Sequence, residues 1–361
     1  MELVQFKSTE RMTCVAMTSR ERLTLALNHQ QADRLPVCPL LCGVSRTLAD
    51  VDYPTWSTDS AACAKALAAA ARTYEMDCVV ALTDLSVECD AWGQKIVFPE
   101  NEAAHPDYAS CVIRDLADYE TFQAADYTKS RRMTAQIDVC RRLVADIGKE
   151  KPVIAFVFGP LGVLSMLRGQ ENLYMDLMDD PDAVRGALEK VTQTLEGYVR
   201  ALMDTGVDAI MWDTLFASGS IMSKQMWRET GFDFVAHLAQ VVRQCGCQNM
   251  IHNCGERIYF DVQIEAIAPS AISFLYPPDD CADFKQCKEK YGGQVTLIGA
   301  VPPTLAATGT DEQWDAACRA SIDDMAKGGG FVLATGCEYP ANASMARAAR
   351  MVQIAQTYGK Y

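Results

Sequence analysis

One histidine and two cysteines have the residue types and the spacing of a metal site. His252 and Cys254 stand two positions apart at the end of an apolar run, and Cys337 follows a second apolar run, residues 331–333. An imidazole and two thiols presented from two strand ends would give zinc three protein ligands and an open fourth position, which is typical of catalytic zinc. The chain has 15 cysteines. The alternative is therefore that these are ordinary buried cysteines beside a hydrogen-bonded histidine.

The elements that must position these residues alternate between strands and helices. Short apolar runs predict about eight strands, and stretches with apolar residues at i, i+3 and i+4, such as 182–205 and 224–245, predict helices between them. The predicted strands are residues 35–41, 78–82, 153–158, 209–212, 249–252, 271–275, 295–298 and 331–334. Such alternation favours a parallel sheet, and this number of units favours a (β/α)8 TIM barrel. A doubly wound sheet is the competing architecture.

Two segments fall outside the regular alternation. Residues 1–17 are expected to form an N-terminal extension, because a capping-box pattern from Thr18 to Glu21 opens the first predicted helix. A single barrel domain is then expected over residues 18–361. The long stretch after the second predicted strand predicts an insertion with a small hairpin, formed by residues 95–98 and 110–113.

The barrel hypothesis places the three metal-ligand candidates at one end. Active sites of such barrels lie at the C-terminal ends of the strands. His252 closes the fifth predicted strand, Cys254 follows it, and Cys337 follows the eighth. Cys245 and Cys247 precede the fifth strand at the opposite end, where we expect a structural role or none.

Three carboxylates are expected at the same end as the metal-ligand candidates. Asp213 follows the fourth predicted strand. It could take a proton, orient a substrate or lie in the outer shell of the zinc, although capping of the following segment is the alternative. Asp84 and Glu88 follow the second strand, where they are candidates for catalysis or for favourable contacts with a helix dipole.

Composition narrows the classes of partner and compartment. The net charge of −14 disfavours nucleic acid or an anionic membrane as the main partner. No run of about 18 apolar residues predicts a membrane-spanning helix, and no secretory signal is apparent at the start. Scattered cysteines without such a signal are typical of a reducing cytoplasm and free thiols. Whether the chain assembles with copies of itself stays open.

Several short motifs together resemble the uroporphyrinogen decarboxylase superfamily. The resemblance runs from about Thr18 to the C-terminus and implies a (β/α)8 barrel. The motifs that carry it are residues 19–28, 32–37, 84–88, 91–93, 159–160, 167–169, 179–181, 217–220 and 329–333.

Within that superfamily, the metal-ligand candidates resemble those of the zinc-dependent corrinoid methyltransferases, including the methylcobamide:coenzyme M enzymes. The relevant motifs are His252-x-Cys254 and Gly336-Cys337-Glu338. The resemblance implies Zn²⁺ at these residues and transfer of a methyl group between a corrinoid and a small substrate held through a thiol or another heteroatom. A separate partner protein would carry the corrinoid, since the chain has no Asp-x-His-x-x-Gly cobalamin-binding motif. Coenzyme M, another thiol, tetrahydrofolate and a methoxylated aromatic all remain candidates, in either direction of transfer.

The chain also departs from the superfamily's patterns. True decarboxylases carry an arginine-rich segment near the N-terminus, whereas the residues after Pro39 are Leu-Leu-Cys-Gly-Val. A lyase without a metal requirement is therefore the alternative, not the favoured function. Residues 273–276 and 299–303 also differ from the loops of many relatives, so we expect the metal to be retained and the substrate to differ.

Overall fold

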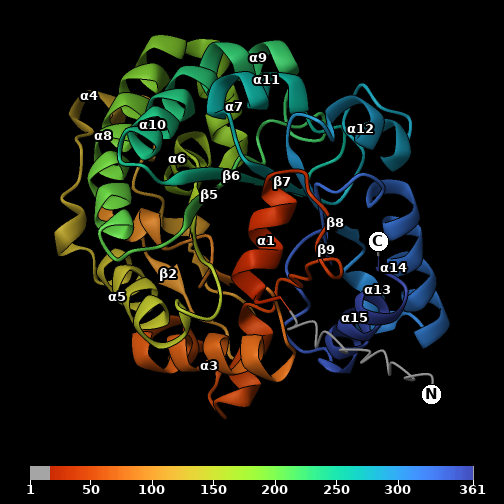
Figure 1. The fold of residues 1–361 in the computed structure, drawn as a ribbon. Coiled ribbons are helices and arrows are strands. Elements are labelled where there is room, and N and C mark those ends of the chain that lie inside the picture. Colours follow the sequence, from red (N-terminus) through yellow and green to blue (C-terminus); the bar gives the residue numbers. More distant parts are fainter. Residues whose placement is uncertain (1–16, 361) are drawn as a thin grey trace, which may run out of the picture.

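Seven parallel strands form a strongly curved sheet with helices packed around its outside (Figure 1). The computed structural model describes residues 17–360, so nearly all of the predicted N-terminal extension lies outside the described residues. The strands are hydrogen-bonded in the order β1-β4-β5-β6-β7-β8-β9. Their bounds are β1 Val79–Ala81, β4 Val153–Phe158, β5 Ala209–Asp213, β6 Gln248–Asn253, β7 Ala271–Phe274, β8 Thr296–Val301 and β9 Phe331–Thr335.

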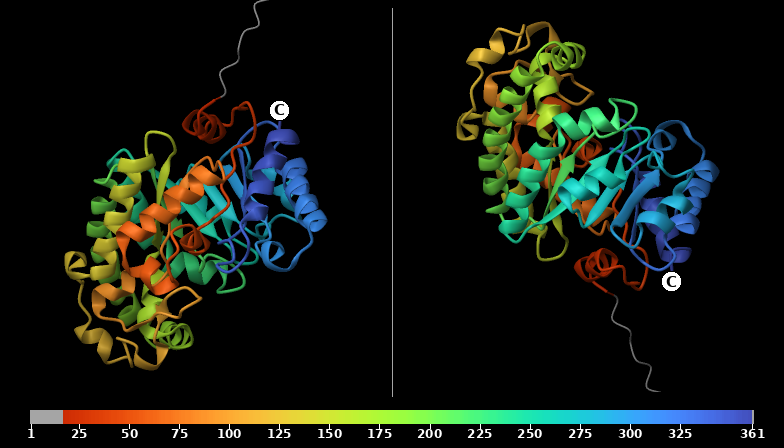
Figure 2. Two further views of the ribbon diagram at one scale, coloured as in Figure 1. Left: turned by 90° about the horizontal axis from the view of Figure 1, so that it is seen from below. Right: turned by 90° about the horizontal axis from the view of Figure 1, so that it is seen from above.

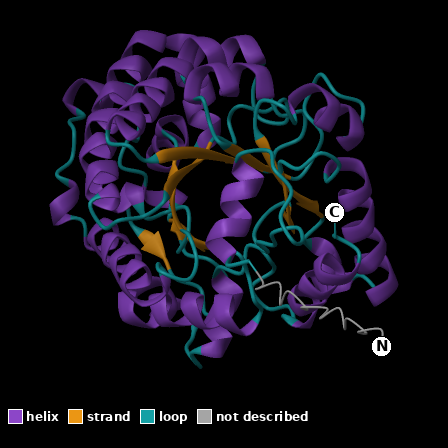
Figure 3. Ribbon diagram, viewed as in Figure 1, coloured by secondary structure: helices purple, strands orange, loops and turns teal. Residues whose placement is uncertain are grey.

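The strands are buried on both faces, which explains why they appear in the sequence as short continuous apolar runs. All residues of β4, β5, β8 and β9 are buried. In the ribbon coloured by secondary structure, the strands form an inner ring and the helices form an outer layer (Figure 3). The predicted (β/α)8 barrel architecture is confirmed.

The helices fill the connections between strands. No described helix is long and apolar enough to span a membrane. The bounds of the α-helices are α1 Ser19–Leu27, α2 Tyr53–Thr58, α3 Ser60–Thr73, α4 Asp118–Thr121, α5 Arg131–Ile147, α6 Pro160–Arg168, α7 Gln170–Asp179, α8 Pro181–Met203, α9 Lys224–Thr230, α10 Phe232–Gln244, α11 Phe260–Ile267, α12 Phe284–Tyr291, α13 Thr304–Thr308, α14 Asp311–Met325 and α15 Ala346–Thr357. The 3₁₀ helices are η1 Gly43–Leu48, η2 Glu88–Trp92, η3 Tyr108–Ser110 and η4 Tyr127–Lys129.

One predicted helix is two helices in the structure. The segment 224–245 was expected to be continuous, but α9 ends at Thr230 and α10 begins at Phe232. Gly231 lies between them, and a Cβ there would stand only 2.9 Å from the indole nitrogen of Trp227. The chain therefore bends at a position that packs closely against a large buried side chain.

The first predicted strand, residues 35–41, does not form a regular strand. It contributes a single parallel bridge, between Val37 and Leu333 of β9. Pro36 and Pro39 lack the N–H groups that a ladder needs, so only a short stretch can pair. The barrel is nevertheless closed here, because Cys38 N donates to Leu333 O at 2.9 Å and Asp77 N donates to Val37 O at 2.8 Å.

Helix α1 covers the end of the barrel where the strands begin. Its capping box, predicted from the sequence, is present at Thr18 and Glu21. Arg20 pairs with Asp208, which immediately precedes β5, and Thr296 at the start of β8 donates to the carbonyl of Ala26 at 2.9 Å. The views from below and above show α1 at one end of the molecule (Figure 2). The C-terminal ends of the strands are thus the end left for a site.

The insertion between β1 and β4 is present, but its hairpin differs from the prediction. Strand β2, Ile96–Val97, pairs antiparallel with β3, His105–Pro106, rather than with residues 110–113. The latter segment is held elsewhere. Val112 N donates to the Gln94 side chain at 3.1 Å, and Ile113 N donates to Leu167 O at 3.0 Å.

The buried carboxylate of Asp77, where the segment of Val37 closes the barrel against β9, should contribute strongly to the free energy of unfolding. Asp77 is fully buried and accepts from Arg22 at 2.6 Å, Arg34 at 2.7 Å and Val37 N at 2.8 Å. We predict that Asp77→Ala lowers the free energy of unfolding by about 3–5 kcal/mol, because Arg34 loses its charge partner, Arg22 keeps only Asp33, and the buried Val37 N loses its acceptor. The measurement is the denaturant midpoint by circular dichroism.

The exposed pair of Arg72 and Asp146 is the control for that substitution. Asp146→Ala should cost less than about 1 kcal/mol, since exposed ion pairs contribute little. Equal effects of the two substitutions would contradict the role given to Asp77.

Candidate metal centre

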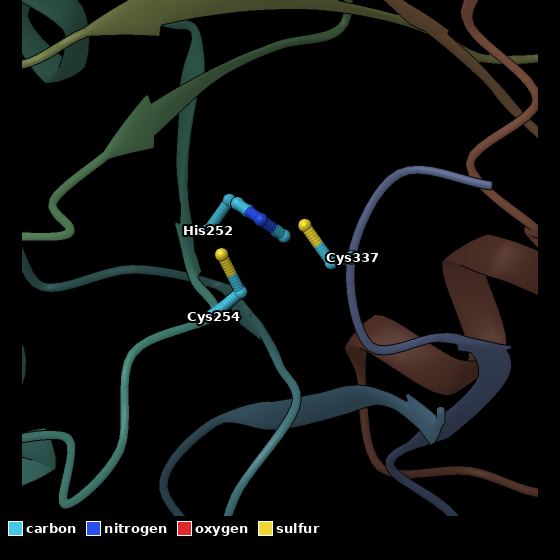
Figure 4. A group of neighbouring side chains, drawn as sticks. All are labelled: His252, Cys254 and Cys337. Atoms are coloured by element: carbon cyan, nitrogen blue, oxygen red, sulfur yellow. The ribbon is translucent and has the colours of Figure 1, made fainter. Parts of the chain in front are cut away.

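The structure brings His252, Cys254 and Cys337 together. His252 lies in β6, Cys254 follows that strand directly, and Cys337 lies two residues after β9. Their ligand atoms all lie within 4.8 Å of one another. The close-up view shows the imidazole and both thiols pointing toward a shared space (Figure 4). They form the one group of this kind in the part of the chain that the structure describes.

Two tight turns hold the cysteines in this position. The residues on either side of Cys254 are joined, because Asn253 Oδ1 accepts from Gly255 N at 3.0 Å. Asn253 Nδ2 also donates to Thr214 O at 2.7 Å. Before Cys337, a Cβ on Gly336 would stand 2.6 Å from the Cα of Leu275, so only glycine fits. Both thiols are therefore fixed through backbone contacts to neighbouring strand ends.

His252 has one ring nitrogen already occupied. Its Nδ1 lies 3.0 Å from the hydroxyl oxygen of Ser273, which is its register partner on β7. This contact leaves Nε2 as the nitrogen available to a metal, with Nδ1–H donating to Ser273. The ring of Phe156 lies 5.8 Å from the imidazole and closes another side. In the sequence, Ser273 belongs to a run that departs from relatives, and nothing there predicts this contact with His252.

Contact between the two thiols shifts their pKa values in opposite directions. The neighbouring Cys254 thiol and His252 lower the pKa of Cys337 to about 4 in spite of burial. The same contact raises the pKa of Cys254 far above its ordinary value. Burial acts to lower the pKa of His252, but contact with Cys337 and the nearby negative groups outweighs it, and the pKa is raised. The cluster thus holds one thiolate readily and a second only with an added positive charge.

Asp213 lies beside the imidazole, because it is the register partner of His252 on β5. Burial raises the pKa of this carboxyl to about 6, while His252 opposes the shift. Its Oδ1 accepts from Leu215 N at 3.0 Å. The carboxyl is thus placed next to the cluster with a pKa suited to proton exchange near neutral pH.

Asp84 and Glu88 lie at the same end of the barrel but outside the ligand cluster. Arg132 binds both oxygens of Asp84, and the Ser86 hydroxyl donates to it at 2.5 Å, so that carboxylate is fully engaged. Glu88 Oε1 accepts from Phe158 N at 3.2 Å, whereas its Oε2 is buried without a partner. Burial raises the pKa of Glu88 to about 8. Glu88 is therefore a neutral acid at neutral pH and Asp84 is one half of an ion pair.

Glu338 was part of the predicted Cys337 motif but had no role assigned. It is half-buried, and its Oε1 accepts from Gly43 N at 2.8 Å. Burial raises the pKa of this carboxyl to about 7. The contact ties the loop after β9 to the segment that follows the first, irregular strand.

A closed parallel barrel with an imidazole and two thiols at the C-terminal ends of its strands defines the class, a (β/α)8 protein with an open three-ligand centre. Residues 18–358 match the uroporphyrinogen decarboxylase (URO-D) family. The chain belongs to this family, which confirms the predicted resemblance.

Relatives within the family have more than one activity in their names. A methylcobamide:CoM methyltransferase of Methanosarcina barkeri is 22% identical over 324 residues, which cover 89% of this chain and 92% of that protein. A uroporphyrinogen decarboxylase of Xanthomonas axonopodis pv. citri is 23% identical over 337 residues, covering 87% and 90%. Among solved structures, a methyltransferase from Methanosarcina mazei has a TM-score of 0.77 at 19% identity and covers 95% of this chain and 99% of its own. The structural similarity shows the shared fold.

The lowered pKa of Cys337 beside Cys254 gives a pH prediction for the metal-free protein. Cys337 should react with iodoacetamide at pH 6, where a thiol of ordinary pKa is protonated. Removing the neighbouring thiol in Cys254→Ala should raise the pKa of Cys337 and slow its alkylation at pH 6 by roughly tenfold or more, because the thiolate fraction falls. Mass spectrometry of each cysteine measures the rates.

Cys111→Ala, in the insertion, should leave the Cys337 rate unchanged. An alkylation profile of Cys337 that is the same with and without Cys254 would show that Cys254 does not lower the pKa of Cys337.

Proposed function

We propose that this protein is a zinc-dependent methyltransferase that moves a methyl group between a corrinoid, carried by a separate partner protein, and a heteroatom of a small substrate. The observation that carries the proposal is the open group of His252, Cys254 and Cys337 at the C-terminal end of the barrel. The methylcobamide:CoM methyltransferase among the relatives supports methyl transfer. We propose a thiol as the substrate, and tetrahydrofolate or a methoxylated aromatic are the other candidates.

The donor set fits zinc in type and in spacing. Ideal tetrahedral zinc with two sulfurs and one nitrogen separates the ligand atoms by roughly 3.5–3.8 Å at the usual bond lengths. The ligand atoms of the three residues lie within 4.8 Å of one another, so sub-ångström shifts suffice. Ser273 supports the fit, because it holds the imidazole with Nε2 free.

Bound zinc with two thiolates and a neutral imidazole would have almost no net charge, and it would supply a Lewis acid that deprotonates a bound thiol but leaves it nucleophilic. The chain's own residues contribute the remaining steps. Cys254 must release its proton, and Asp213 can hold the substrate's proton at Oδ2, which has no hydrogen-bond partner among the described residues. Glu88 would serve as a neutral hydrogen-bond donor, and Asp84 would position the wall of the site through Arg132.

The metal-free lyase is the weaker candidate. A porphyrinogen with several carboxylates needs a group of cations at the barrel mouth. In the segment after Pro39, Arg46 is bound instead to Ala341 O at 2.5 Å and to Asn342 Oδ1 at 2.7 Å. These contacts leave little of its guanidinium for a substrate carboxylate.

The metal prediction concerns affinity and ligand identity. The purified protein should bind one zinc ion, and His252→Ala or Cys337→Ser should abolish stoichiometric binding. Ser273→Ala should keep the ion but bind it roughly 10–100-fold more weakly, because the imidazole loses its orienting partner. Competition with a chromophoric chelator measures the affinity.

Ser270→Ala is the matched control, since Ser270 precedes the same strand at the opposite end of the barrel. Zinc affinity that is equal in Ser273→Ala and Ser270→Ala would contradict the orienting role of Ser273.

The activity prediction uses free methylcobalamin and small thiols. The zinc-loaded protein should demethylate methylcobalamin, followed by its absorbance, and His252→Ala or Cys337→Ser should abolish the reaction. Asp213→Asn should keep zinc and slow the reaction roughly 100-fold or more, as expected for loss of a proton acceptor. Asp204→Asn, at an exposed helix end, is the control.

Two results would overturn the proposed function. One is full methyl transfer by protein shown to contain no zinc. The other is decarboxylation of a porphyrinogen by the zinc-free protein, which would favour the lyase.

A further inference from the structure

Glu338 is a carboxyl beside the candidate metal ligands to which the proposed reaction gives no task. It directly follows Cys337, and its Oε1 accepts from Gly43 N at 2.8 Å. Burial has the largest effect on the pKa of this carboxyl, and Cys337, Asp84 and His252 also act on it, so these three groups lie close by. Its Oε2 has no hydrogen-bond partner among the described residues, and the side chain is only partly buried. One carboxyl oxygen is therefore free beside the metal ligands.

The packing around Gly43 fixes the place of this carboxyl. A Cβ on Gly43 would stand 2.0 Å from the Tyr53 hydroxyl, so a larger residue would have to displace that ring. Tyr53 is 1% exposed, and the guanidinium of Arg46 lies 5.0 Å from its ring centre. The N–H group that holds Glu338 thus belongs to a closely packed segment, and the carboxyl is held through it.

A second free carboxyl oxygen lies beside the other metal ligands. Asp213 is 5% exposed, and its Oδ2 has no hydrogen-bond partner among the described residues. It neighbours His252 on β6, whereas Glu338 neighbours Cys337 after β9. A substrate bound at the metal ligands would therefore meet a carboxyl group next to each of the two strand ends.

The arginines nearest to these carboxyl groups are occupied within the protein. Arg132 holds both oxygens of Asp84 through its two Nη atoms. Arg46 is 6% exposed and donates to two oxygens of residues 341–342. Neither guanidinium is available to an anionic group of a substrate.

Arg257, in the loop after β6, is exposed and belongs to another part of the surface. Its side chain packs at Gly219, next to the hydroxyl of Tyr259. The ring of Tyr259 in turn faces Lys224, the first residue of α9. Arg257 therefore lies toward the outer layer of helices and not beside Glu338.

We propose that the substrate of the metal centre is a small aminothiol, whose ammonium group donates to Glu338 Oε2. This inference rests on the proposed function, because the metal centre is what would hold the sulfur. Hydrogen bonds between an ammonium and a carboxylate are charge-assisted and strong. The sulfonate of coenzyme M would instead meet carboxyl groups without a free cation beside them, and such like-charge contacts exclude a wrong ligand.

The test compares three thiols that differ only in the group at the end of a two-carbon spacer. They are 2-mercaptoethylamine, 2-mercaptoethanol and 2-mercaptoethanesulfonate, which is coenzyme M. Calorimetric titration of the zinc-loaded full chain gives the dissociation constant of each thiol, and the absorbance of methylcobalamin gives its rate of demethylation. We expect the amine to bind roughly tenfold or more tighter than the sulfonate, as a charged hydrogen bond would require.

Glu338→Gln separates recognition of the tail from binding of the sulfur. The substitution keeps an acceptor for Gly43 N and removes the charge. It should weaken binding of 2-mercaptoethylamine roughly tenfold or more and leave that of 2-mercaptoethanol unchanged, a contrast that differences in thiol acidity cannot produce. Glu312→Gln, in the exposed first turn of α14, is the matched control and should bind all three thiols like the unaltered protein.

The outcomes distinguish this inference from the proposed function. Tighter binding of the sulfonate than of the amine, or an equal loss of all three thiols in Glu338→Gln, overturns the aminothiol. Demethylation by the sulfonate alone would refute the aminothiol and support the methyltransferase. Zinc content is measured in every sample, and zinc-loaded protein that binds none of the three thiols would contradict both proposals.

Discussion

Closure of the parallel barrel is the constraint on which the rest of the structure depends. Strands β6 and β9 are far apart in the sequence, and their ends face one another only because the sheet curves into a ring. The seam is closed by one bridge, Val37 to Leu333, and by Asp77 with its two arginines. The same buried charges fix α1 over the end where the strands begin. The candidate metal ligands lie at the other, uncovered end.

Much of this fold could be predicted, because strands buried on both faces appear as continuous apolar runs. β4 has the predicted bounds, and the other strands begin or end within a few residues of theirs. The errors have local physical causes. Two prolines prevent a regular first strand, and the insertion pairs through a two-residue hairpin whose partner, residues 105–106, has no apolar alternation.

The site was predictable only as far as strand ends reveal it. The positions of Cys254 and Cys337 follow from the strands that precede them. Ser273 could not be found in the same way, since it lies opposite His252 only through the register of β6 and β7. The ion pair of Asp84 could not be predicted from the sequence, because its partner Arg132 lies 48 residues further along, after a long insertion.

Three carboxyl groups at one end of this barrel have three different states, and the difference arises from what replaces water around each. Arg132 forms an ion pair with Asp84. Burial makes Glu88 a neutral acid although Arg132 opposes the shift, and at Asp213 the imidazole partly offsets the effect of burial. The interior at this end thus resists additional negative charge. If a divalent ion were held by Cys254 and Cys337 as proposed, the two thiolates would already neutralise it, and the thiolate of a bound substrate would be tolerated best with its proton nearby. In the proposed reaction Asp213 would hold that proton, because burial raises its pKa to about 6 while the imidazole beside it opposes the shift.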